Sequence, residues 1–265
     1  MQPESLGYRT DLMLLRLQGS VVTVGRDYLV VRTPANPGFH WGNFVLADES
    51  SVDRPLADLV GIFHAEHPAA AHLAIGVDGV EGRAWDDDAL GECGLEVGRS
   101  VVMTATQAQE PARPNTEAVC RMLASDDDWA AAVDLQSAEH GEFDPAEHRD
   151  VVQRLMGARR LLQEAGLGGW FGAFVGGELL CDLGLFTDGS GLGRFQSVET
   201  AVSARRLGLA STLVHHASVV GLRDLAIRDL VMVADPDYSA IRIYRSLGFL
   251  ESEIQIQLSR PGHNP

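Results

Sequence analysis

The chain has 265 residues, more than the ~100–150 of a typical domain, and this length predicts two compact units. Its formal net charge of −16 makes nucleic acid an unfavourable partner, because an acidic surface repels the phosphate backbone. No apolar run reaches the ~18 residues that span a bilayer, and the 3 cysteines form no CxxC pair, so the composition predicts a cytoplasmic protein without a disulfide scaffold.

The most distinctive stretch of the N-terminal half is residues 36–44, Asn-Pro-Gly-Phe-His-Trp-Gly-Asn-Phe. After a Pro-Gly turn signal, Phe39, Trp41 and Asn43 alternate with the residues between them, which predicts a strand. Two interpretations stay open. In the first, Trp41 and Asn43 form a wall of a substrate site. In the second, the stretch packs in a seam between two domains.

The rest of this half shows three further predicted elements. We expect a strand over His72–Gly76, a short helix over Asp86–Glu92 and a strand over Ser100–Ala105. Residues 107–116 then hold two prolines and no apolar periodicity, which predicts an extended connector. We therefore expect one domain over residues 1–110 and a second over residues 117–260.

The second half has predicted elements in the order β-α-α-β-β-β-α-β-α-β. The predicted strands are Val119–Leu123, Trp170–Val175, Glu178–Phe186, Arg194–Val202, Leu230–Ala234 and Leu250–Leu258. The predicted helices run from an N-cap at Ser125 to about His140, from Pro145 to about Leu162, over Ala210–Val220 and over Ser239–Leu247. Hairpins followed by strand–helix–strand crossovers predict an α/β (α+β) fold, in which helices cover a mixed sheet.

Arginine and glycine cluster at the start of one of these helices, in Arg205-Arg206-Leu207-Gly208-Leu209-Ala210. The first turn of a helix presents unpaired amide groups and the positive end of its dipole. Gly208 and Ala210 leave little bulk over those amides, and two guanidinium groups add charge-assisted hydrogen bonds. The segment predicts a cradle for a pyrophosphate. The alternative is an ordinary helix start with a packing glycine and two solvated arginines.

Two other kinds of phosphate site are excluded. A P-loop needs a lysine, and all 21 basic residues are arginine. Gly189, Gly191 and Gly193 join two strands and precede no helix, so they do not form a dinucleotide fingerprint.

The pattern Arg205-x-x-Gly208-x-Ala210 after a strand resembles the acetyl-CoA motif of the GNAT superfamily of N-acetyltransferases. Farther along, residues 237–249 read Asp-Tyr-Ser-Ala-Ile-Arg-Ile-Tyr-Arg-Ser-Leu-Gly-Phe and are similar to that superfamily's Asn-x-x-Ala-x-x-x-Tyr-x-x-x-Gly-Phe segment. The resemblance covers roughly residues 117–260. The sequence departs from the pattern at Asp237, where asparagine is usual, and at Val202, where proline is frequent.

The resemblance implies that acetyl-CoA is the acyl donor. Its pyrophosphate would lie on the amides of Leu207–Ser211, and its arm would pair with the backbone of Ala201–Ser203 as an added partial strand. The cofactor-binding residues implied are Ala201, Val202, Ser203, Arg205, Arg206, Leu207, Gly208, Leu209, Ala210, Ser211 and Asp237. No metal is implied, and His215 and His216 diverge on a helix and predict none.

The resemblance also implies two catalytic residues. Tyr244 would protonate the departing thiolate, the alternative being an aromatic side chain packed in the core. Glu199 would remove a proton from the amine, the alternative being a structural hydrogen-bonding role. Strict alternation along the strand places Glu199 on one face with Phe195 and Ser197, and Gln196 on the other.

These residues together imply an N-acetyltransferase that moves an acetyl group from acetyl-CoA to a primary amine of a small molecule or peptide, by direct attack in a ternary complex. The alternative is a catalytically inactive GNAT-fold module that binds CoA or acts by protein contact. A longer acyl donor also stays open. Residues 1–106 lack the arginine–glycine loop, yet the elements predicted over 72–105 follow the order of those over 230–258. The N-terminal half is therefore predicted to be a degenerate GNAT-like repeat.

Overall fold

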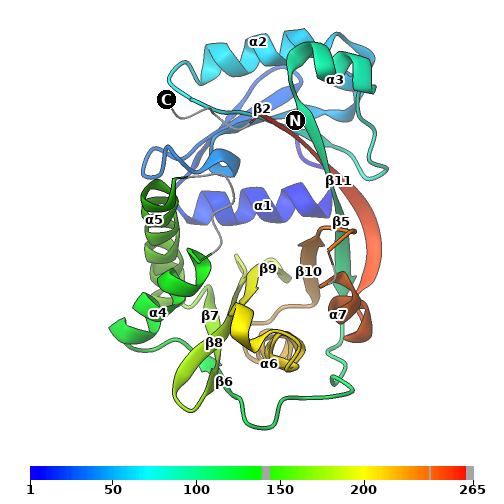
Figure 1. The fold of residues 1–265 in the computed structure, drawn as a ribbon. Helices are drawn as coiled ribbons and strands as arrows, with labels where there is room; N and C mark the ends of the chain where they lie inside the picture. Colours follow the sequence, from blue (N-terminus) through cyan, green and yellow to red (C-terminus); the bar gives the residue numbers. More distant parts are fainter. Residues whose placement is uncertain (139–143, 239, 261–265) are drawn as a thin grey trace. The chain divides into compact units, whose positions relative to one another are not determined.

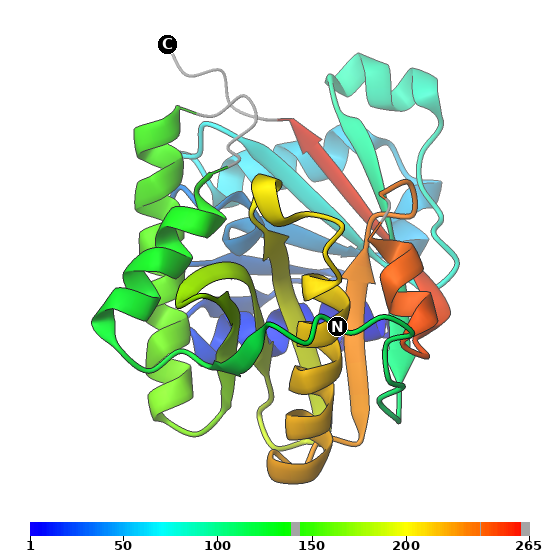
Figure 2. The same ribbon diagram turned by 60° about the horizontal axis from the view of Figure 1, so that its bottom comes forward.

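The computed structural model describes residues 1–138, 144–238 and 240–260 (Figures 1 and 2). Its contacts divide the chain into two compact units. Unit 1 comprises residues 1–102, 233–236 and 251 onward, and unit 2 comprises residues 103–232 and 237–250. This division differs from the expected domain boundaries at two places: residues 103–110 lie in unit 2, and the C-terminal strand lies in unit 1. None of the helices in the described ranges is long and apolar enough to cross a membrane.

Unit 1 is built on a mixed sheet with the strand order β1-β2-β3-β4-β11-β5. Its elements are α1 (Leu6–Leu17), β1 (Val21–Val24), β2 (Tyr28–Arg32), η1 (His40–Gly42), β3 (Phe44–Asp48), η2 (Glu49–Asp53), α2 (Leu56–Glu66), β4 (Leu73–Asp78), α3 (Asp87–Cys93), β5 (Glu96–Ala105, up to residue 102) and β11 (Leu250–Arg260, from residue 251). The first three strands form an antiparallel meander, β4 runs parallel to β3, and β11 is antiparallel to β4. Every residue of β4 is buried, as expected of a strand covered on both faces.

Unit 2 is built on the strand order β10-β9-β8-β7-β6. Its elements are β6 (Val119–Met122), α4 (Asp126–Gln136), α5 (Pro145–Glu164), β7 (Gly168–Val175), β8 (Glu178–Phe186), β9 (Leu192–Thr200), η3 (Val202–Ala204), α6 (Leu209–Asp224), β10 (Asp229–Ala234, up to residue 232) and α7 (Ile241–Ser246). This confirms the predicted order of elements. Two predicted helix ends, His140 and Ser239, lie outside the described residues.

The helices of unit 2 cover both faces of its strands. α4 and α5 contact β7, β8 and β9, and Gln136 of α4 and Arg159 of α5 lie near Asp182 on β8. α6 packs on the other face (Figure 2). Gly221 of α6 lies there against the side chain of Leu185 of β8. A side chain of β8 or β9 therefore contacts α4 and α5 on one face of the sheet and α6 on the other.

The same order of elements occurs twice along the chain. An antiparallel meander, a helix, a parallel strand, a helix and a further strand appear as β1-β2-β3-α2-β4-α3-β5 and again as β7-β8-β9-α6-β10-α7-β11. This confirms the predicted internal repeat. The last strand of the second copy, β11, pairs with β4 of the first, so the repeats in the sequence do not coincide with the compact units.

Residues 39–44 do not form the strand that their alternation predicts. His40–Gly42 form the 3-10 helix η1, and only Phe44 begins β3. The side chain of Asn43 donates to the carbonyl oxygens of Asn36 (3.1 Å) and Phe39 (2.9 Å) and accepts from the amide of Thr33 (2.9 Å). These bonds fold the segment back on itself. The amide that was a candidate for substrate contact is used by the backbone of unit 1.

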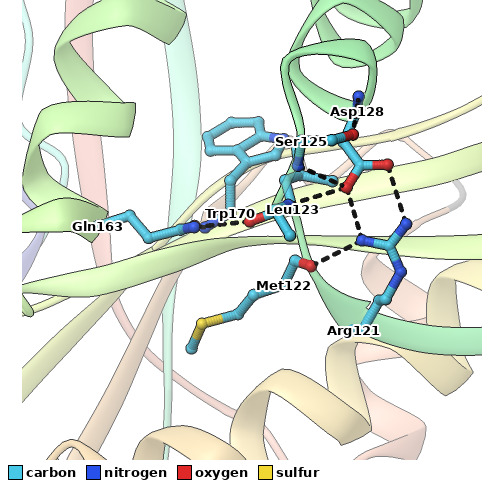
Figure 3. A network of polar contacts seen from close by, with 8 residues as sticks. Arg121, Met122, Leu123, Ser125, Asp128, Gln163 and Trp170 are labelled. Carbon is cyan, nitrogen blue, oxygen red and sulfur yellow. Dashed lines mark hydrogen bonds and ion pairs between the residues drawn. The ribbon is translucent and has the colours of Figure 1, made fainter.

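A network of polar contacts fixes the start of α4 (Figure 3). Ser125 and Asp128 form a capping box, which confirms the predicted N-cap. Arg121 of β6 makes a bidentate ion pair with Asp128, at 2.6 and 2.9 Å. Gln163 of α5 bridges the carbonyl oxygen of Leu123 (2.7 Å) and the amide of Trp170 (2.8 Å). These contacts join four elements, β6, α4, α5 and β7, to one another.

Candidate functional site

β9 and β10 pair over only part of their length. The parallel register joins Leu192, Gly193 and Arg194 to Asp229, Leu230 and Val231 and then ends. Residues 195–200 of β9 therefore have no strand partner on β10. Nearby side chains bond some of their backbone groups: Gln196 Nε2 donates to the carbonyl oxygen of Phe195 at 3.0 Å, and Arg205 Nε donates to that of Thr200 at 3.2 Å. An extended chain on this edge would replace these side-chain bonds. β9 ends at Thr200, two residues earlier than predicted.

A bulge interrupts the other edge of β9, between Gln196 and Glu199. On β8, Asp182 pairs with Glu199 and Gly184 with Gln196, so one extra residue of β9 lies between these pairs. Ser197 has φ 44°, a conformation that residues with a Cβ adopt rarely. The bulge changes which side chains share a face.

The predicted facing of Glu199 is wrong for this reason. Glu199 and Gln196 lie on the same face as Asp182, toward α4 and α5, whereas Phe195 pairs with Leu185 on the α6 face and contacts Phe249. Strict alternation fails because the extra residue shifts every following side chain to the other face.

The N-terminus of α6 carries no side-chain cap. Its first-turn amides belong to Leu209, Ala210 and Ser211, and no acceptor for them is found among the described residues. Gly208 precedes them with φ 79°, in the left-handed region that favours glycine. Arg206 and Leu207 are exposed at this turn. The turn therefore presents free donors and a positive dipole end.

The connector between β5 and β6 runs across this turn (Figure 2). The side-chain amide of Asn115 donates to the carbonyl oxygen of Leu207 at 2.9 Å, and its backbone amide donates to Thr212 Oγ1 at 2.8 Å. A Cβ on Gly208 would lie 2.9 Å from the carbonyl oxygen of Arg113. The space beside Gly208 is thus filled by backbone of the connector. This corrects the expectation that the glycine leaves room for a phosphate. The connector bonds to a carbonyl group and a hydroxyl group and leaves the first-turn amides free.

Arg205 points back toward β9. Its Nη2 lies 3.3 Å from Glu199 Oε1, and its Nε donates to the carbonyl oxygen of Thr200 at 3.2 Å. Glu199 Oε1 also accepts from the amide of Thr200, at 3.0 Å. Arg205, which was expected to contact the phosphate, and Glu199, which was expected to act as the base, are therefore bonded to each other.

The backbone of Ala201–Ser203 is not extended. Val202–Ala204 form the 3-10 helix η3, and the amide of Ala201 already donates to the carbonyl oxygen of Leu180 at 2.9 Å. The prediction of an added strand at these residues is therefore wrong in its position. The part of β9 that has no strand partner on β10 lies earlier, over residues 195–200.

Tyr244 lies on α7 with 6% of its surface exposed. Its ring packs edge-on against Phe249, which in turn packs against Phe195 on the α6 face of the sheet. Burial raises the pKa of Tyr244, and the charges of Cys181, Tyr238 and Glu199 raise it further. Asp237 is exposed in the loop before α7.

Sequence reasoning missed a buried polar cluster beside Glu199. Asp182 is fully buried and accepts from Gln136 Nε2 (2.6 Å) and Trp170 Nε1 (3.0 Å). Burial raises the pKa of Asp182 to about 7 against the opposing effect of these hydrogen bonds. The guanidinium of Arg159 lies 4.6 Å from the centre of the Trp170 ring. An acidic residue inside a predicted apolar strand, Glu178–Phe186, was the signal that could have revealed the cluster.

No group of three or more metal-ligating side chains is found in the described part of the chain. No protein-family model matches the sequence, and no curated protein matches it.

Solved structures do match, at low sequence identity. A functionally unknown conserved protein from Staphylococcus epidermidis aligns with a TM-score of 0.73 at 11% identity, over 92% of this chain and 95% of its own. A GCN5-related N-acetyltransferase from Kribbella flavida aligns with a TM-score of 0.67 at 16% identity, over 98% and 97%. The chain has the GNAT fold. A tandem GNAT protein from the clavulanic acid biosynthesis pathway aligns with a TM-score of 0.51 at 14% identity, over 99% and 96%.

The GNAT fold thus extends over nearly the whole chain and includes both copies of the repeat. At these identities the likeness concerns the fold, and activity has to be argued from the site.

Proposed function

We propose that this protein is an N-acyltransferase that moves an acetyl group from acetyl-CoA to a primary amine of a small molecule or peptide. One observation carries the proposal. Residues 195–200 of β9 have no strand partner on β10, and they are followed, after the 3-10 helix η3, by the uncapped N-terminus of α6. A strand edge binds an extended amide-bearing arm, and helix amides bind a diphosphate. Coenzyme A carries both groups on one chain.

The residues at the helix start fit a diphosphate. The free amides of Leu209, Ala210 and Ser211 point from the first turn, and the small side chain of Ala210 leaves them open. Arg206 is exposed beside them and has no ion pair within the described ranges. We assign the charge-assisted contact to Arg206, since Arg205 is bonded to Glu199.

The proposed reaction uses both faces of the sheet. Acetyl-CoA supplies the acyl group as a thioester. The amine nitrogen forms a bond to the carbonyl carbon while the carbon–sulfur bond breaks, and Glu199 takes the proton that the amine loses. Tyr244 donates its phenolic proton to the departing sulfur from the opposite face. Burial disfavours the phenolate and the thiolate alike, so the sulfur is a stronger base there than in water.

The test combines calorimetry with acetyl-CoA and a thiol-release assay over a panel of primary amines. Tyr244→Phe should lower turnover by about 10²–10⁴-fold while the dissociation constant for acetyl-CoA stays within about twofold. Tyr28→Phe, in unit 1, is the matched control and should match the wild type. An unchanged rate in Tyr244→Phe removes Tyr244 from the mechanism.

A second candidate is a GNAT-fold module that binds CoA without catalysis. The ion pair of Arg205 with Glu199 favours it, because a carboxylate oxygen that is bonded to a guanidinium would have to leave that partner before it could bond an amine. Binding of acetyl-CoA without turnover of any amine would support this candidate. Comparing acetyl-CoA with succinyl-CoA in the same assay decides which acyl donor is used.

A further inference from the structure

The side chain of Gln136, the last residue of α4, joins two strands of unit 2. Its Nε2 donates to Asp182 Oδ1 on β8 at 2.6 Å and to the carbonyl oxygen of Ser197 on β9 at 2.9 Å. Both acceptors flank the bulge of β9. Gln136 therefore contacts the one point at which the pairing of β8 and β9 is interrupted.

The bulge needs such a contact because its backbone is strained. Ser197 has φ 44°, a region in which a residue with a Cβ is less stable than in its preferred conformations. Ser197 itself is exposed, so its own side chain is not held by packing. A relaxed strand without the bulge would move Glu199 to the opposite face.

Asp182 orients the amide of Gln136. It is fully buried, and its second oxygen accepts from Trp170 Nε1 at 3.0 Å. Glu199 faces it from β9 and Arg159 from α5, while Cys181 is its neighbour along β8. Arg159 makes no ion pair with Asp182 within 4.0 Å; its Nη2 lies 3.5 Å from Gln196 Oε1, and its buried Nε has no hydrogen-bond partner. The carboxylate is therefore held by two neutral donors and a more distant cation.

We propose that Gln136 and Asp182 are positioning residues of the acyltransferase: the ionised Asp182 orients the Gln136 amide, which clamps the bulge at Ser197 and keeps Glu199 on the face toward α4 and α5. This inference rests on the proposed function. Neither residue touches the reacting atoms, and both act through the backbone of β9.

The clamp responds to pH. A protonated Asp182 presents a hydroxyl in place of one acceptor, so the bond from Gln136 or that from Trp170 weakens. Burial raises the pKa of Asp182 to about 7, so the clamp is complete above neutral pH and loosens as the pH falls below it. Arg159 opposes this shift and Glu199 adds to it.

The first test needs no turnover. In the wild type, the indole N–H resonance of Trp170 should titrate with a midpoint near pH 7, and in Asp182→Asn it should not titrate. Hydrogen exchange of the amides over residues 195–200, corrected for intrinsic rates, should be faster in Gln136→Met than in the wild type at pH 8. A Trp170 resonance that does not titrate, or unchanged exchange in Gln136→Met, overturns the clamp.

The second test is a kinetic cycle in the full chain. Gln136→Met should lower kcat about tenfold and leave the KM for acetyl-CoA unchanged, because the loss of one hydrogen bond to a charged group corresponds to about a tenfold change in rate. Ser197→Gly reaches φ 44° without strain, so in that background Gln136→Met should lower kcat by only about twofold. Equal losses in both backgrounds indicate a general structural role and overturn the inference.

The two proposals fail in different ways. A wild type that binds no acetyl-CoA and releases no thiol overturns the proposed function and this inference together. A wild type that turns over an amine, with an unchanged kcat in Gln136→Met and an unchanged melting temperature, overturns this inference alone.

Discussion

Glu199 and Arg205 are bonded to each other, with Oε1 of the carboxylate 3.3 Å from Nη2 of the guanidinium. Both side chains are about one-third exposed, at 30% and 35%, so the pair is worth little in stability. The pair matters because it changes the orientation of Arg205, the arginine of the Arg205-x-x-Gly208-x-Ala210 motif. The arginine that the motif offers for a phosphate is turned toward the strand, and its neighbour Arg206 faces solvent.

Arg206→Ala should therefore weaken acetyl-CoA binding more than Arg205→Ala does. We expect a loss of about tenfold for Arg206→Ala, since charge-assisted bonds to phosphate are removed, and about threefold or less for Arg205→Ala. Calorimetry at low and high salt measures both, and the difference between the two variants should shrink as salt screens the guanidinium. A larger loss in Arg205→Ala would return the phosphate contact to that residue.

Asn115→Asp should destabilise unit 2. The aspartate keeps the oxygen that accepts from the amides of Glu117 and Ala118, both at 3.0 Å, but removes the donor to the carbonyl oxygen of Leu207. A carboxylate facing a carbonyl oxygen is repelled, so we expect a loss of about 1–2 kcal/mol. Urea unfolding measures it. Thr116→Ala, at the next and exposed position, should change stability by less than about 0.5 kcal/mol.

Asp128→Asn and Asp127→Asn form a matched pair in the first turn of α4. Asp128 belongs to the capping box and to the ion pair with Arg121, so its substitution should cost about 2 kcal/mol. Asp127 is exposed, and its substitution should have an effect within about 0.5 kcal/mol. Thermal or urea unfolding compares the two, and equal effects would show that the helix dipole dominates over the network.

The Asp128 carboxyl should also contribute to acid sensitivity. Its hydrogen bonds with Arg121 hold the pKa of Asp128 below its usual value, so the folded state favours the carboxylate. The stabilisation is complete above the unfolded pKa of about 3.9 and is lost as the pH falls below it. The wild type should lose stability more steeply than Asp128→Asn below about pH 4.

Unit 1 should lose stability at a less acidic pH. The rings of His40 and His72 are stacked, with centroids 4.1 Å apart, and burial lowers the pKa of His40 to about 4 and also lowers that of His72 and of His67. The unfolded chain binds these protons near pH 6.5, so stability is complete above that pH and falls as the pH decreases toward 4. Urea midpoints at pH 7.5, 6 and 5 measure the fall. His40→Phe keeps a ring that can stack on His72 but cannot bind a proton, so the fall in stability with decreasing pH should be smaller in this variant.

The sequence by itself determined the features that depend on neighbours along the chain. The order of strands and helices, the N-cap at Ser125 and the repeat of the two halves follow from periodicity and capping, which act over a few residues. The GNAT fold was predictable for the same reason, because its two motifs are local and lie in a set order.

The tertiary structure alone decided what depends on the register between strands and on distant side chains. One extra residue at Ser197 moved Glu199 to the face of Asp182, and alternation within one strand cannot reveal an insertion relative to its partner. The burial of Asp182 depends on Gln136 and Trp170, which come from other elements. The pairing of β11 with β4 joins residues almost two hundred positions apart, and such pairings are set by packing of the whole sheet rather than by local preference.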